Sequence, residues 1–164
     1  MTTHPIPPVI SVDPQTPPRV LILGSFPSVK SRETAFFYGH PQNRFWRVMA
    51  AVLQEPVPET VEQKIAMLIS HSIALWDVIA SCDITGSTDS SITNATPTDL
   101  TPILKCGTIK AIFTNGTTAT RLYTKYQYSA TGIPAIPLPS TSPANARQSL
   151  TDLTEAWSVL CSYL

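Results

Sequence analysis

The feature that most constrains the fold is an unbroken apolar run, Val20 to Leu23, which stops abruptly at Gly24-Ser25-Phe26-Pro27-Ser28. A short continuous run of this kind predicts a strand buried on both faces, and the glycine and proline after it predict the loop that leaves the strand. Strands buried on both faces are typical of parallel sheets covered by helices, where ligands bind at the loops after the strands. The run therefore predicts a fold class and the place of a site.

Strand-like and helix-like segments alternate along the rest of the chain. Strands are predicted at 20–23, 73–76, 109–113 and 133–138, and helices at 43–53, 58–70, 98–105, 117–126 and 146–164. This alternation predicts an α/β fold, a three-layer α/β/α sandwich with a central four-stranded parallel sheet. The Ser- and Thr-rich stretch 81–98 predicts a long surface loop, and such loops in compact domains are often functional.

The chain has 164 residues, of which 43% are hydrophobic and 13% charged. We expect a single domain over residues 19–164, able to bury roughly 70% of its unfolded surface. The proline-rich residues 1–18 predict an extended arm. They lack a positively charged start and a long apolar core, so we expect neither a signal peptide nor a membrane anchor, but a cytoplasmic monomer.

Three cysteines, Cys82, Cys106 and Cys161, lie far apart in the sequence. They cannot form a CxxC pair or a four-ligand zinc or iron-sulfur site within the chain. Their scatter indicates buried thiols in a reducing compartment. We therefore expect no cofactor and no metal or iron-sulfur cluster.

The charges are unevenly distributed although the net charge is zero. Residues 19–50 carry a net charge of +4 and residues 100–150 a net charge of +5. If these segments meet in space they form an anion-binding face; the alternative is that sparse charges cluster by chance. The predicted strands end at Gly24 to Ser28, at Asp77, at Asn115 and at Ser140 to Asn145, and parallel strands bring these ends to one edge. The basic segments contain three of the four ends.

The same segments resemble a known family. GSFPS after the first predicted strand, FYGHPQNRFW shortly after it and LPSTSPANA after the last are similar to the motifs of the uracil-DNA glycosylase superfamily. HPxNxFW resembles the mismatch-specific uracil glycosylase branch, whereas IALWDVIASCDITGSTDSSI together with SxSPAN most resembles the hypoxanthine-DNA (deoxyinosine) glycosylase branch. The similarity spans about residues 19–160.

The resemblance implies a monofunctional DNA glycosylase of base excision repair. Such an enzyme flips a deaminated base out of double-stranded DNA and hydrolyses its N-glycosidic bond. Hypoxanthine is favoured as the base, with uracil and xanthine as alternatives. The base would lie against the backbone of the first motif and against aromatic faces. The residues expected to bind it are Gly24, Ser25, Phe26, Pro27, Phe37, Tyr38 and Asn115.

Asn43 matches the Asn of HPxNxFW and is expected to position the attacking water or the base. A neutral amide cannot act as a general base, so His40 and Asp77 are the nearby candidates for that role. Each also has a purely structural interpretation: Asn43 as a helix cap, His40 as a loop hydrogen-bonder, Asp77 as a turn cap and Asn115 as part of a turn.

The loop after the last predicted strand is expected to bind phosphates and to enter the gap left by the flipped base. The residues expected to contact DNA are Ser28, Lys30, Ser140, Thr141, Ser142, Pro143, Ala144, Asn145 and Arg147, with Arg147 just inside the final helix.

Two departures from the family pattern leave alternatives open. Phe26 stands where relatives carry a catalytic side chain, and Ser140-Thr141-Ser142 lacks the His of the most active uracil-specific enzymes. A non-catalytic DNA-damage-binding module on the same fold is therefore the main alternative. GSFPSVKS also approaches a phosphate-binding GxxxxGK[ST] loop, but Val29 replaces the second Gly and Pro27 lacks an N–H, which argues against a nucleotide-binding enzyme.

Overall fold

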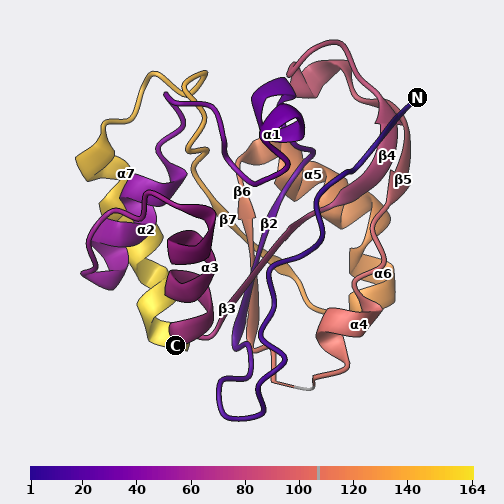
Figure 1. The fold of residues 1–164 in the computed structure, drawn as a ribbon. Helices are drawn as coiled ribbons and strands as arrows, with labels where there is room; N and C mark the ends of the chain where they lie inside the picture. Colours follow the sequence, from indigo (N-terminus) through magenta and orange to yellow (C-terminus); the bar gives the residue numbers. More distant parts are fainter. Residues whose placement is uncertain (107) are drawn as a thin grey trace.

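The computed structural model describes residues 1–106 and 108–164. A four-stranded parallel sheet lies at its centre, in the order β3-β2-β6-β7 (Figure 1). The strands are β2 (Val20–Gly24), β3 (Ile73–Asp77), β6 (Ala111–Asn115) and β7 (Ala135–Leu138). All four end at the same edge, as predicted.

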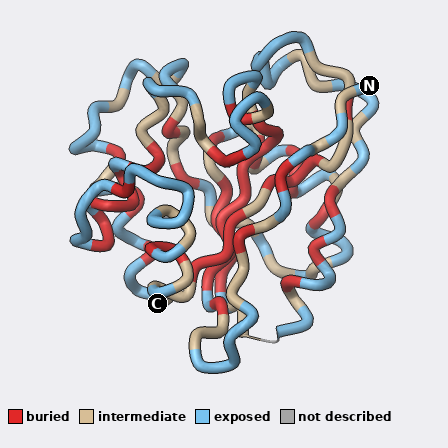
Figure 2. Tube along the Cα trace, in the orientation of Figure 1, coloured by how far each residue is buried: buried red, intermediate tan, exposed pale blue. Residues whose placement is uncertain are grey.

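Helices cover both faces of this sheet, which confirms the three-layer α/β/α arrangement (Figure 1). One face carries α2 (Phe45–Leu53), α3 (Val61–Ser70) and α7 (Leu150–Trp157); the other carries α4 (Thr101–Leu104), α5 (Thr117–Tyr126) and α6 (Tyr128–Thr131). β2 supplies both cores, because Val20 and Ile22 pack with the first group and Leu21 and Leu23 with the second. Figure 2 shows the resulting concentration of burial in the central strands.

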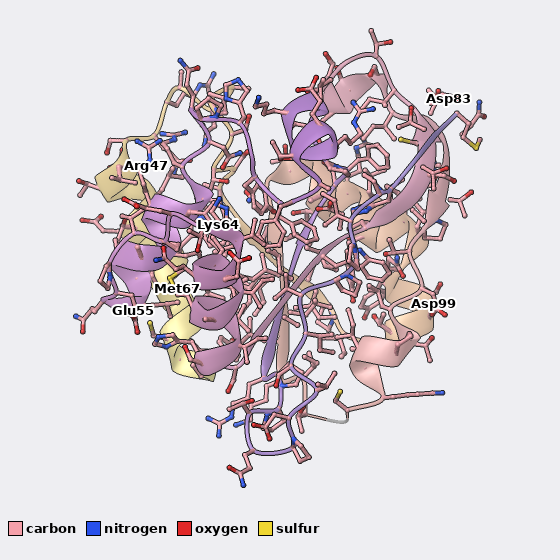
Figure 3. The ribbon with its side chains drawn as sticks, viewed as in Figure 1. Arg47, Glu55, Lys64, Met67, Asp83 and Asp99 are labelled. Atoms are coloured by element: carbon pink, nitrogen blue, oxygen red, sulfur yellow. The ribbon has the colours of Figure 1, made fainter. Side chains whose placement is uncertain are left out.

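Helix α2 places Phe45 and Trp46, the aromatic residues that end the FYGHPQNRFW segment, in the core. Trp46 is 6% exposed, stacks on Phe36 and donates from its indole nitrogen to the Phe37 carbonyl over 3.1 Å. The Lys64 ammonium lies 5.3 Å from the Trp46 ring centre, and burial lowers the pKa of Lys64. Figure 3 shows Lys64 on α3 together with Met67, which is buried. Trp46 therefore belongs to the core.

The predicted final helix, 146–164, is wrong at both ends. α7 begins only at Leu150, because Ser149 caps it with a reciprocal capping box to Asp152. After Trp157 the chain continues as a 3₁₀ helix, η2 (Ser158–Tyr163). Arg147 consequently lies in the loop before the helix rather than inside it.

The predicted long loop at 81–98 is also wrong. The segment forms a β-hairpin of β4 (Ile79–Asp83) and β5 (Thr93–Pro97), with the 3₁₀ turn η1 (Asp89–Ser91) near its tip. Ile79 and Cys82 anchor the hairpin, since both are fully buried. Only the tip of the hairpin behaves as the expected loop.

Residues 1–18 are extended, but they pack against the domain. β1 (Thr2–Thr3) pairs with β4 and completes a second sheet, in the order β1-β4-β5 (Figure 1). Farther along the arm, Ile6 and Val9 are buried, and Val9 forms an antiparallel bridge with Leu75 at the edge of the central sheet. The arm thus joins the two sheets.

A short helix that we did not predict, α1 (Val29–Thr34), follows β2 and is capped by the Ser28 side chain. Among the described residues, no helix is long and apolar enough to cross a membrane. The same residues contain no cluster of three or more His, Cys, Asp or Glu side chains suited to a metal ion. Cys82 is buried, but Cys106 and Cys161 are exposed, so the expectation of buried thiols is wrong for these two.

Candidate functional site

A cleft of about 1040 Å³ opens at the edge where the four parallel strands end. The segments after β2, β3, β6 and β7 meet there, and the tip of the β4–β5 hairpin closes one side. Most of the predicted site residues line this cleft; they are Ser25, Phe26, Pro27, Ser28, Phe37, Tyr38, His40, Asn43, Asp77, Asn115, Ser140, Thr141, Ser142, Pro143, Ala144, Asn145 and Arg147. Gly24 lies beside Asp77 at its base, whereas Lys30 is exposed outside it.

Gly24 is a glycine because two side chains occupy the space of a Cβ atom. A Cβ there would overlap the Asp77 carboxylate and lie 2.9 Å from the Tyr38 hydroxyl oxygen. β2 and β3 pair in register at this point, Gly24 opposite Asp77, so the carboxylate is held against the backbone of β2. The base of the cleft is thus built from Gly24, Asp77 and Tyr38.

Asp77 is 3% exposed and is paired with a residue that sequence reasoning missed. Its Oδ2 lies 2.7 Å from Nε2 of His4, in the N-terminal arm. The His4 ring packs against Phe26, Phe37 and Trp76. No described group donates a hydrogen bond to Oδ1 of Asp77, which leaves this oxygen available at the base of the cleft.

Tyr38 carries the one buried side-chain oxygen or nitrogen among the described residues that has no hydrogen-bond partner. Burial and, to a smaller extent, the Asp77 carboxylate raise the pKa of the Tyr38 hydroxyl above its ordinary value. The Asn115 side chain lowers it by less, because the amide lies near the hydroxyl without meeting the geometry of a hydrogen bond. The ring is fixed by stacking on Phe45 at 4.1 Å between ring centres, and the backbone is left-handed, with φ 53°. An unpartnered hydroxyl in this position can bond a ligand.

Asp89, at the hairpin tip, is a second carboxyl in the cleft that sequence reasoning did not single out. Its Oδ1 accepts a hydrogen bond of 2.9 Å from the Ser25 hydroxyl. Although the residue as a whole is exposed, the carboxyl is turned inward, and desolvation raises the pKa of Asp89, with a smaller contribution from Asp77. The only sequence signal for it was its place in a polar segment after a strand.

Two further contacts hold the hairpin tip over the loop after β2. The Val29 N–H donates to the Ser87 hydroxyl over 2.9 Å, and the Arg32 guanidinium donates to the Gly86 carbonyl over 2.6 Å. Asp89 is therefore carried on an anchored segment.

On the opposite side of the cleft, Thr141 joins three segments. Its side chain donates to Oδ1 of Asn43 over 2.9 Å and accepts from Nδ2 of Asn115 over 3.0 Å. Its backbone N–H donates to Oδ1 of Asn115, and its carbonyl accepts from the Arg44 N–H, each over 3.0 Å. Thr141 is fully buried, so in this structure its hydrogen bonds join the three segments, and its contact with DNA stays a prediction.

The oxygen of the Asn43 side chain accepts hydrogen bonds from the protein, whereas its nitrogen donates to no described group. Oδ1 accepts from the Phe45 N–H over 2.9 Å as well as from Thr141. No described group accepts a hydrogen bond from its amide NH₂. Asn43 can therefore offer donors to a ligand, but its oxygen is not available to orient a water molecule.

Two sets of hydrogen bonds hold the loop from Ser140 to Gln148 in place: one comes from Arg44, the residue before α2, and the other from within the loop. Arg44 donates to the carbonyls of Ser142 (3.1 Å), Asn145 (2.7 Å) and Gln148. Asn145 adds bonds of 2.9 Å to the Ser140 carbonyl and to the Gln148 side chain. Pro143 and Ala144 remain exposed at the tip, beside the cleft.

The basic face suggested by segment charge does not assemble at the cleft. Of the ten basic residues in those segments, all of them described, Arg147 alone lines it. Arg19 and Lys110 lie at the opposite edge, where Lys110 N–H donates to the Arg19 carbonyl. With Asp77 and Asp89 inside, the cleft is more acidic than the segment charges suggested.

The positions of Phe26, Phe37 and His40 limit what each can do at the cleft. Phe26 and Phe37 are 7% and 2% exposed, so neither offers an open ring face for stacking in this conformation. Nδ1 of His40 accepts from the Gln42 N–H over 3.1 Å, as in the loop-bonding interpretation, and the side chain is exposed at the rim.

The fold and the cleft define the class of protein. The family described as the uracil DNA glycosylase superfamily matches residues 12–161, and the chain belongs to this superfamily. It is similar to proteins named "Hypoxanthine DNA glycosylase" from Methanosarcina acetivorans (39% identity over 74 residues, 44% of this chain and 47% of the relative) and Methanosarcina barkeri (33% over 87 residues, 52% of each). The matched segments thus span about half the length of these curated relatives.

A solved structure supports the fold over the whole domain. It is the solution NMR structure of a "putative Uracil DNA glycosylase" from Methanosarcina acetivorans, with a TM-score of 0.76 and 29% identity, covering 94% of this chain and 96% of the other.

Proposed function

We propose that this protein is a monofunctional DNA glycosylase that flips a deaminated base from double-stranded DNA and hydrolyses its N-glycosidic bond. Hypoxanthine is the favoured base, with uracil and xanthine as alternatives. The observation that supports this proposal most directly is the cleft at the strand ends, which is lined by all three segments with family motifs and by Asp77. The names of the two relatives support the choice of hypoxanthine.

The base of the cleft suits a deaminated purine. Deamination turns N1 of adenine from a hydrogen-bond acceptor into an N–H donor and replaces the amino group by a carbonyl. An ionised Asp77 accepts hydrogen bonds only, so its available Oδ1 pairs with N1–H of hypoxanthine and faces the lone pair of adenine unfavourably. The Tyr38 hydroxyl, beside it, is the group left to donate to the base carbonyl.

Bond cleavage leaves negative charge on the departing base, which donors in the cleft would stabilise. The N–H groups of Ser25 and Phe26 donate to no acceptor in the described part of the chain. The Asn43 amide adds two further donors. Among the residues that the structure describes, no lysine lines the cleft, which favours direct hydrolysis over a Schiff base with the sugar.

The direct test is incubation of the protein with end-labelled duplexes bearing hypoxanthine, uracil, xanthine or adenine at one position, followed by alkali to cut abasic sites. We expect cleavage at hypoxanthine, less at the other deaminated bases and none at adenine. Absence of cleavage in every duplex at excess protein would contradict an enzymatic function.

A non-catalytic damage-binding module is the second candidate, and one observation favours it. Phe26 brings no polar group to the first motif, and Oδ1 of Asn43 is already occupied by two protein donors. Tight binding to the hypoxanthine duplex without cleavage would support this candidate over the first.

A further inference from the structure

The N-terminal arm contributes a buried histidine to the base of the cleft. The side chains of His4 and Asp77 are 3% and 4% exposed, and 2.7 Å separates Nε2 from Oδ2. These residues are 73 positions apart in the sequence. A buried carboxylate requires a hydrogen-bond donor, and the arm supplies it.

The second ring nitrogen shows which form of histidine is present. Nδ1 of His4 accepts a hydrogen bond of 3.1 Å from the Ile6 backbone N–H. A nitrogen that accepts carries no proton, so the ring is neutral and its proton is on Nε2. His4 therefore donates to Oδ2 of Asp77 from a neutral imidazole.

Contacts on both sides of His4 hold the ring in place. The backbone N–H of His4 donates to the Ala80 carbonyl over 2.7 Å. Nearby, the Trp76 indole donates to the Ile6 carbonyl over 3.0 Å. The ring also meets Phe26 edge-on at 5.8 Å between centres.

We propose that His4 is a positioning residue for the glycosylase site, whose Nε2–H holds Oδ2 of Asp77 and thereby aims the other oxygen, Oδ1, at the N–H edge of a deaminated base. This inference rests on the proposed function and adds to it a residue outside the family motifs. His4 would act only through Asp77 and would not touch the base.

The other titratable groups near Asp77 do not replace this donor. Tyr38 and Asp89 both interact electrostatically with Asp77, from the loop after α1 and from the hairpin tip. Asp89 disfavours a charged neighbour, and the Tyr38 hydroxyl makes no hydrogen bond to the carboxylate. Without His4, no described residue donates a hydrogen bond that would hold the orientation of the buried Asp77 carboxyl.

The test compares H4A and H4Q with wild type in single-turnover cleavage of the hypoxanthine duplex between pH 6 and 9. We expect H4A to lose on the order of 100-fold in rate, because the Asp77 carboxyl is no longer held in position. H4Q retains an N–H donor and is expected to recover most of the loss. H71A is the matched control, since His71 pairs with a carboxylate, Glu55, away from the cleft.

The proposal is overturned if H4A matches H71A at every pH, or if H4Q is as slow as H4A while both remain folded. Nitrogen-15 NMR of the wild-type imidazoles provides a readout that needs neither activity nor a variant. We expect His4 to be neutral with its proton on Nε2 at pH 7. A cationic ring, or a proton on Nδ1, overturns the inference even if cleavage is observed, whereas an inactive protein with the expected tautomer contradicts only the proposed function.

Discussion

The two sides of the cleft differ in how far their polar groups are satisfied. On the amide side, Thr141 hydrogen-bonds both Asn43 and Asn115, and Arg44 holds the adjacent loop. On the carboxyl side, Asp77 and Asp89 lie close enough to interact, and the Tyr38 hydroxyl has no partner. Groups whose bonding is complete maintain geometry, whereas incompletely bonded groups remain available to a ligand. The comparison places the scaffold on the amide side and the recognition chemistry on the carboxyl side.

Asn43 is the residue that could break this division, because its amide NH₂ is free although its oxygen is not. N43D keeps the acceptor for Phe45 and Thr141 but removes the two donors, while N43A removes both functions. If Asn43 stabilises the departing base, both variants should lower the single-turnover rate by about 100-fold, with duplex affinity largely unchanged. Wild-type rates in N43D would make Asn43 purely structural and move the catalytic role to Asp77 or His40.

T141V tests whether the amide side acts as the scaffold. The substitution removes the hydroxyl that bridges Asn43 and Asn115, so we expect a loss of about 2 kcal/mol in unfolding free energy, measured by urea denaturation. T141S keeps the hydroxyl and should lose less than about 1 kcal/mol. Equal losses in the two variants would show that the bridge itself contributes little.

Y38F tests the carboxyl side by removing its unpartnered hydroxyl. We expect stabilisation by about 1 kcal/mol, a rise in Tm of roughly 2–4 °C, together with slower cleavage of the hypoxanthine duplex. Y123F is the matched control, because the Tyr123 hydroxyl is bonded to Thr131 (2.6 Å) and to the Ile133 carbonyl (2.5 Å). It should lower Tm, and a Y38F variant that behaves like it would show that the Tyr38 hydroxyl has a partner in solution.

D89N provides the smallest expected effect, and its sign depends on pH. The folded state raises the pKa of Asp89 above the ordinary 3.8, so the folded protein holds this proton more tightly than the unfolded chain. Its stabilising contribution is complete below pH 3.8 and is lost as the pH rises through the raised value. D89N should therefore raise Tm at pH 7, by no more than about 2 °C because the residue is partly solvated, and the gain should vanish below pH 3.8. A gain independent of pH in thermal melts would assign the effect to something other than this carboxyl.

The sequence was sufficient to predict the central sheet and the edge that carries the cleft. The apolar run of β2 and the loop residues after each strand are local signals, and parallel pairing brings those ends together without further information. The start of α7 could also have been predicted, because Ser149 and Asp152 have the spacing of a capping box. Arg147, which precedes the cap residue Ser149, would then have been predicted to lie in the loop.

The hairpin and the arm could not be predicted in the same way. β4 and β5 contain few apolar residues, and the strand that completes their sheet is Thr2–Thr3, far away in the sequence. His4 stands among prolines with no periodic pattern, so only the packed structure shows that it meets Asp77. Asp89 was likewise placed by the hairpin turn and the Ser25 hydroxyl rather than by a motif.

The docking of the arm also bears on how the site forms in time. The contact of His4 with Asp77 spans 73 positions, and the pairing of β2 with β6 spans still more of the chain, since Val20 lies opposite Ala111. Both are long-range contacts, which form slowly compared with local ones. The cleft is complete only when the sheet and the arm have both assembled, so refolding should recover base recognition no earlier than sheet structure.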